Sequence, residues 1–278
     1  MSHTAPVLLP QPWLAIDPLY PGGFFPPLRA VAGDEMLGQA AAARRATDWR
    51  AARCSAEHAA AQALEAGSAD DEADALGELA AVALLSGHAD EAEALYRRVL
   101  EGDAGPLPRF RARIGLGVVA GVRGEYQAAL GEIRTALSPS PALNDADYTV
   151  VLANLSAALL GLGRLWEAEK EGAEALRAGR RRKDEYVAAI GGFAAALAHL
   201  ARGRANEART RLADCARAFA RAGDVLRQVQ CHHLLGEIAY DGEDPIRAGS
   251  HYRDGLGLAR AAGAVGTVEL LTLRFEHR

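Results

Sequence analysis

The 278-residue sequence has few residues of the kinds that build β-sheets, few cysteines and no long apolar run. It holds 6 Ile and 6 Phe against 61 Ala. Because Ala is the best helix former and β-branched and aromatic residues favour strands, we expect an all-α fold. The three cysteines, at positions 54, 215 and 231, lie far apart, which argues against a disulfide framework and against a four-ligand zinc site.

Several classes of function find no support in the sequence. With 31 basic and 36 acidic residues the formal charge is -5, so the chain has no general attraction to nucleic acid. No window approaches about 18 consecutive apolar residues, and the start MSHTAPVLLPQPW lacks a basic region, so we expect a soluble, cytoplasmic protein that does not bind membranes. The absence of any Gly-Lys dipeptide excludes a phosphate-binding loop of the P-loop type. We expect no cofactor.

The chain does contain an internal repeat. Six segments join the end of one apolar helix to the start of a second, namely TDWRAA (47–52), GHADEA (87–92), GEYQAA (124–129), GRLWEA (163–168), GRANEA (203–208) and EDPIRA (243–248). Their closing alanines are spaced by 40, 37, 39, 40 and 40 residues. Glycine in the turn permits a left-handed C-cap, and the alanine allows two helix backbones to cross closely.

The repeat resembles the tetratricopeptide (TPR) family. The third unit carries seven of the family's signature residues, which are Leu116, Gly117, Gly124, Tyr126, Ala129, Ala136 and Pro141. The period of nearly 40 exceeds the usual 34 and is similar to that of long arrays in bacterial signal-transduction ATPases and transcriptional regulators. The resemblance implies a right-handed α-solenoid of about six helix pairs over residues 34–260, and a role in protein interaction. Residues 261–278 are predicted to add a capping helix.

Residues 1–33 form a segment of a different kind. They hold 7 of the 12 prolines, which excludes helix, yet they are rich in apolar side chains that need a partner. The aromatic ones are Trp13, Tyr20, Phe24 and Phe25. This N-terminal arm could dock into the groove of the array, cap its first unit, or pack on a second copy in a homodimer.

In TPR proteins one face of each first helix lines a concave groove, and the resemblance assigns that face here. The groove positions are Leu84, Arg111, Gly115, Val118, Val122, Asn154, Ala157, Phe193, Leu197, His233 and Glu237. Most are apolar, which favours an extended apolar peptide, a partner segment or a small apolar molecule as ligand. Asn154 stands out, because a buried amide needs hydrogen-bond partners that either a peptide backbone or a neighbouring helix would supply.

Catalysis is the alternative to a function in binding alone. His233, Glu237 and Tyr240 cluster at helical spacing, and with Arg111 they could serve acid/base catalysis on a hydrophobic substrate. The run Cys231, His232 and His233 is no metal-binding motif, because adjacent residues on a helix diverge by about 100°. The sequence therefore predicts a regulatory binding or scaffold protein without a metal, and an enzyme that uses the same groove as the alternative.

Overall fold

The computed structural model describes residues 24–27, 35–138, 142–263 and Thr272. Within these residues the chain forms twelve α-helices and no strand, which confirms the predicted all-α class. The helices are α1 (Glu35–Arg45), α2 (Trp49–Ala66), α3 (Ala69–Leu85), α4 (Ala89–Glu101), α5 (Pro106–Val122), α6 (Tyr126–Ala136), α7 (Asp145–Gly161), α8 (Leu165–Arg181), α9 (Glu185–Ala201), α10 (Ala205–Arg221), α11 (Val225–Asp241) and α12 (Pro245–Ala261). They pack in sequence as six antiparallel pairs, so the fold is a helical solenoid.

The long period is absorbed by long helices. From α7 to α12 every helix has 17 residues, and three residues join each to the next. Two such helices with their two connections give the period of 40. The regularity shows that the additional residues lengthen the helices and leave the turns short.

The turn within each pair uses one residue in the left-handed conformation. Gly87, Gly124, Gly163 and Gly203 supply it in four pairs, where no Cβ opposes a positive φ. In the first and last pairs Thr47 (φ 63°) and Glu243 (φ 58°) take the same conformation. The chain geometry is thus conserved in all six turns even where glycine is missing, at the cost of local strain.

The alanines that close the six repeated segments all lie at helix crossings. These residues are Ala52, Ala92, Ala129, Ala168, Ala208 and Ala248, and none is more than 2% exposed. A larger side chain at these positions would force the paired helices apart. Their burial explains why alanine recurs with the period of the fold.

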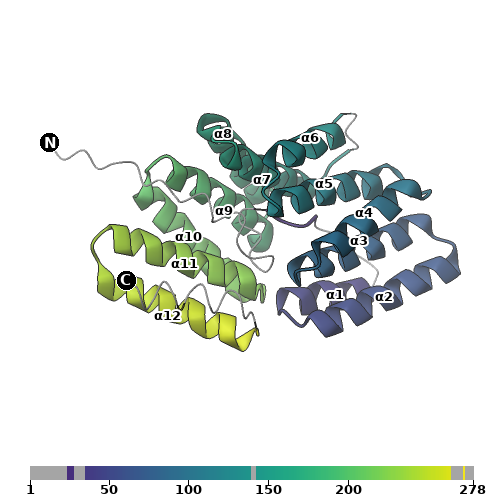
Figure 1. Cartoon of the computed structure of the whole chain (residues 1–278), viewed down its shortest axis with the longest axis horizontal. Helices are drawn as coiled ribbons and strands as arrows, with labels where there is room; N and C mark the ends of the chain where they lie inside the picture. The colour runs from purple at the N-terminus through teal and green to yellow at the C-terminus, as the bar shows by residue number, and fades with distance from the viewer. Residues whose placement is uncertain (1–23, 28–34, 139–141, 264–271, 273–278) are drawn as a thin grey trace.

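The six pairs follow an arc whose two ends meet (Figure 1). At the junction Arg45 Nε donates to the carbonyl of Ala222 at 3.1 Å, and Thr47 Oγ1 donates to the carbonyl of Ala262 at 3.2 Å. Trp49 packs against the apolar cluster of α11 and α12. The array therefore curls back on itself. The space between its first helices, here called the central hollow, is filled by residues 24–27, which contact α5, α7 and α11.

Parts of the predicted organisation lie outside the described residues. The capping helix predicted within 261–278 falls beyond them except for its first three residues and Thr272, and residues 24–27 are the described part of the arm. Among the described helices, none has the combination of length and apolar character that crossing a membrane requires.

Candidate functional site

The central hollow contains a short segment of the chain itself. Residues 24–27 lie inside the arc, far in sequence from the helices around them (Figure 1), and all four are buried. Phe24 is 0% exposed and Phe25 is 2% exposed. Both side chains are therefore removed from water as completely as any residue of the core.

Asn154 on α7 binds the main chain of this segment. The Phe25 N–H donates to Asn154 Oδ1 at 2.7 Å, and Asn154 Nδ2 donates to the Phe25 carbonyl at 2.9 Å. The amide thus satisfies both backbone groups of one residue, as a neighbouring β-strand would. Asn154 is itself fully buried, so the pairing also meets its own need for partners.

Arg227 on α11 makes the second contact. Its Nη2 donates to the Phe24 carbonyl, and its Nη1 donates to Gln230 Oε1 at 2.7 Å. The guanidinium lies over the Phe25 ring, with Cζ 3.8 Å from the ring centroid, and the edge of Phe193 meets the same ring at 5.9 Å between centroids. Phe25 is therefore enclosed by a cation on one side and an aromatic ring on another.

Phe24 fills a space that a glycine leaves open. A Cβ added to Gly121 on α5 would overlap the ring of Phe24, so only glycine admits the ring at this point. The apolar cluster around Phe24 includes the predicted groove residues Leu84, Val118, Val122 and Ala157. Phe193 and Leu197 join the cluster around Phe25 instead. The two phenylalanines thus connect the two halves of the array.

Little room remains beside the segment. A space of about 20 Å³ is left against Phe25 and Pro26, lined also by Leu85 and Leu226. That volume admits about one water molecule. A second peptide could enter the hollow only if residues 24–27 left it.

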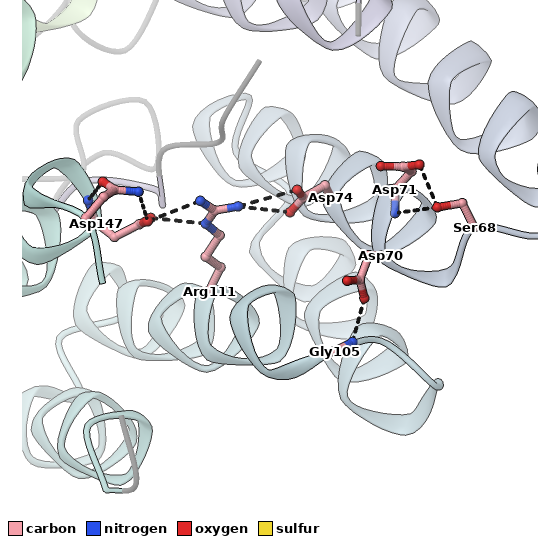
Figure 2. A network of polar contacts seen from close by, with 8 residues as sticks. Ser68, Asp70, Asp71, Asp74, Gly105, Arg111 and Asp147 are labelled. Atoms are coloured by element: carbon pink, nitrogen blue, oxygen red, sulfur yellow. Dashed lines mark hydrogen bonds and ion pairs between the residues drawn. The ribbon is translucent and has the colours of Figure 1, made fainter. Parts of the chain in front are cut away.

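Arg111, predicted to line the groove, lies in a buried ion-pair network (Figure 2). Its Nε donates to Asp147 Oδ1 at 3.0 Å, and its Nη1 lies 3.4 Å from Asp74 Oδ2. Burial opposes the charge of Arg111, but Asp147 and Asp74 outweigh it and raise the pKa of the guanidinium. The network joins α3, α5 and α7 through the Arg111 guanidinium.

Two further polar pairs join neighbouring elements, a buried one between α1 and α3 and a partly buried one between α9 and the N-cap of α11. Arg44 Nε on α1 donates to Glu78 Oε1 on α3 at 2.5 Å, and the Tyr186 hydroxyl on α9 donates to Asp224 Oδ2 at 2.9 Å. Burial and the adjacent Asp224 raise the pKa of the Tyr186 hydroxyl. Arg44, Tyr186 and Asp224 also line the small space beside Phe25, so polar groups lie next to the apolar contacts of the segment.

Three other predicted groove residues contact the second helix of a pair. Gly115 lies under the ring of Tyr96 on α4, so it serves a helix contact. His233 and Glu237 face α12, where the Tyr252 hydroxyl donates to Glu237 Oε1 at 2.6 Å. His233 Nε2 lies 3.6 Å from Glu237 Oε1, and both side chains are buried.

The remaining predicted residues do not add to this site. Tyr240 is 37% exposed near the end of α11. Trp13 and Tyr20 lie outside the described residues. Of the candidate acid/base residues, Arg111 lies in the network of α3, α5 and α7, and His233 and Glu237 lie against α12.

Sequence reasoning missed Arg227 and Gly121. In the last unit the groove positions assigned by the resemblance, His233 and Glu237, lie on the face of α11 that contacts Tyr252 of α12. Arg227 gave little signal, because α11 carries many other polar residues, among them Gln228, Gln230, His232, His233 and Glu237. Gly121 gave no signal, because its role depends on a ring about 100 residues away in the sequence.

No protein-family model and no curated protein sequence matches the chain. Solved structures do resemble it. The crystal structure of BtubC (BKLC) from P. vanneervenii has a TM-score of 0.55 and 18% identity, over 82% of this chain and 92% of that one. MamA (residue 41 to the end) from Desulfovibrio magneticus RS-1 has a TM-score of 0.42 and 16% identity, over 68% of this chain and 96% of that one. Together with the helix pairs, the likeness to BtubC supports a TPR-like helical repeat fold for this chain.

Proposed function

We propose that the chain is a non-catalytic binding protein whose central hollow holds an extended apolar peptide segment of a protein partner. One observation carries the proposal: Asn154 and Arg227 bind main-chain groups of Phe24 and Phe25, as they would bind those of any peptide in the same conformation. Main-chain contacts of this kind supply affinity, while side-chain pockets supply specificity.

The residues that line the hollow define which side chains a partner peptide must carry. Gly121 leaves space for one aromatic ring, and Arg227 with Phe193 encloses a second. Two consecutive aromatic residues in extended backbone therefore fit the hollow. Prolines on their C-terminal side, as in Phe24–Pro27, lower the entropy that binding must remove.

Residues 24–27 act in this proposal as an internal competitor. Because the hollow has no room for two segments, a partner must displace the arm, and its apparent affinity falls by the fraction of molecules in which the hollow is open. The protein is then regulated by its own N-terminal segment. Its three free thiols support placement in a reducing compartment such as the cytoplasm.

The test measures binding of a fluorescent peptide with the sequence YPGGFFPPL, which is that of residues 20–28. The full chain is compared with its Phe24→Ala/Phe25→Ala variant by fluorescence anisotropy. We expect the variant to bind at least about tenfold more tightly, because its arm no longer competes. Adding Arg227→Lys to the variant should weaken binding again, since lysine keeps the charge but loses the planar stacking on the ring.

A peptide with both phenylalanines replaced by alanine is the ligand control. The variant Ile246→Ala is the protein control, because Ile246 is exposed on α12 and should leave binding unchanged. If the folded double variant binds the peptide no better than the full chain does, the proposal is wrong.

The mass of the full chain in solution tests how the arm is held. We expect a monomer with its own arm in the hollow. A dimer that dissociates in the Phe24→Ala/Phe25→Ala variant would show instead that each copy lends its arm to the other.

A further inference from the structure

Three ligand-type side chains converge between the last two helices, away from the hollow. They are His232 on α11 and His251 and Asp254 on α12, and one potential ligand atom of each lies within 4.8 Å of the others. We infer that these three residues form a binding site for a divalent transition-metal ion, with zinc as the best match. The site is independent of the proposed peptide function.

The geometry needs little adjustment to hold an ion. His232 Nδ1 lies 3.9 Å from Asp254 Oδ2, and the two imidazole rings have centroids 5.7 Å apart. Ligand atoms around a tetrahedral zinc ion are separated by about 3.3 Å, as follows from bonds of about 2.0 Å. The three ligand atoms lie within 4.8 Å of one another, so their separations exceed this spacing by at most about 1.5 Å.

The two imidazoles also have unmet bonding capacity. The Nδ1 atoms of His232 and His251 are buried, and neither has a hydrogen-bond partner among the described residues. Buried polar atoms without partners are uncommon in native proteins and call for an explanation. A metal ion placed between them satisfies both atoms at once.

The site also offers a negative charge and access from solvent. Asp254 places a carboxylate oxygen within 4.8 Å of a ring nitrogen of each histidine. The Asp254 side chain is about half exposed, which leaves a path for the ion and a position for a water ligand.

The donor set selects the class of metal. Two imidazole nitrogens and one carboxylate oxygen suit zinc and its neighbours in the first transition row, whereas calcium and magnesium prefer oxygen ligands alone. Because the ligands come from both helices, the ion fixes α12 on α11 and so secures the final pair of the array. Sequence neighbours could not reveal this site, because His232 pairs with His251 on the next helix and not with the adjacent His233.

The test is a zinc titration of the full chain, free of any purification tag and treated with a chelator, followed by calorimetry and thermal unfolding. We expect one zinc ion per chain and a higher unfolding temperature with zinc than without it. Cobalt(II) used as a second probe should give the visible absorption of a four-coordinate site. His232→Gln and His251→Gln should each weaken zinc binding roughly 100-fold or more, since even outer-shell changes cost 10- to 100-fold.

Two controls separate this site from accidental binding. Cys54 Sγ lies 3.8 Å from His58 Nδ1 on the exposed side of α2 and could bind zinc on its own, so His58→Gln is measured in parallel and should retain the site. Circular dichroism checks that each variant is folded. If a histidine variant is unfolded, Asp254→Asn is measured in its place. The proposal is overturned if zinc binding is absent, or if it survives in both His232→Gln and His251→Gln.

Discussion

The side-chain amide of Asn154 pairs with both main-chain groups of Phe25, 129 residues earlier in the chain. Under the proposed function, a partner peptide would make the contact that Phe25 makes here within one molecule. It fixes the position of residues 24–27, because Asn154 is buried and makes both bonds to one residue of this segment.

We therefore expect Asn154→Ala to release the arm. The Phe25 N–H and carbonyl would lose their partners in a buried place, which should lower the free energy of unfolding by about 2–4 kcal/mol. Hydrogen exchange at the Phe25 amide and urea unfolding measure the two effects. Asn206→Ala, at an exposed position on α10, should change stability by less than about 0.5 kcal/mol. Unchanged protection of the Phe25 amide would contradict the role given to Asn154.

Gly121→Ala tests the space for the ring of Phe24. In an ordinary helix this substitution stabilises by about 1 kcal/mol, but here the added methyl group overlaps the ring. We expect a lower unfolding temperature and an arm open to proteolysis. Gly131→Ala on α6 is the matched control, because its methyl group would meet nothing within 4 Å and should raise the unfolding temperature. An equal rise in unfolding temperature in both variants would show that the ring of Phe24 does not require glycine at position 121.

Replacing Glu243 by glycine, in the turn between α11 and α12, should stabilise the protein. Glu243 has a φ of 58°, which costs an L-residue about 1 kcal/mol or more, so Glu243→Gly should raise the free energy of unfolding by about 1 kcal/mol. The equivalent turn one unit earlier has Gly203, and Gly203→Ala should lose a similar amount. Denaturant midpoints measure both, and a loss of stability in Glu243→Gly would refute the strain argument.

Stability should fall in weak acid partly through His199. Burial lowers the pKa of this imidazole, Arg204 and Arg211 lower it further, and Glu169 and Glu207 oppose them. The unfolded chain, with a histidine pKa of about 6.5, then binds the proton more readily than the folded one, so His199 costs stability as the pH falls below about 6.5. His199→Gln should reduce the loss of unfolding free energy between pH 7 and pH 5. An identical pH dependence in the variant would exclude His199 as a source.

Local features of the fold could be predicted from the sequence. Alanine content, glycine at the turns and a closing alanine every 40 residues specify helix pairs, because each depends on the backbone geometry of a few neighbouring residues. The need of Asn154 for backbone partners also followed from the sequence, since a polar amide on an apolar helix face must be satisfied wherever it is buried.

The closure of the arc, the place of Phe24 and Phe25 and the pairing of His232 with His251 were decided by the tertiary structure alone. The first two depend on small rotations between successive pairs, which add up over six units until Arg45 reaches Ala222, whereas His232 meets His251 through the packing of α12 on α11 within one pair. A repeat pattern gives the chemistry of one unit but not the angle between units, because that angle results from side-chain packing across every interface. For the same reason the register of the last unit could not be transferred, and Arg227 was found only once α11 was in place.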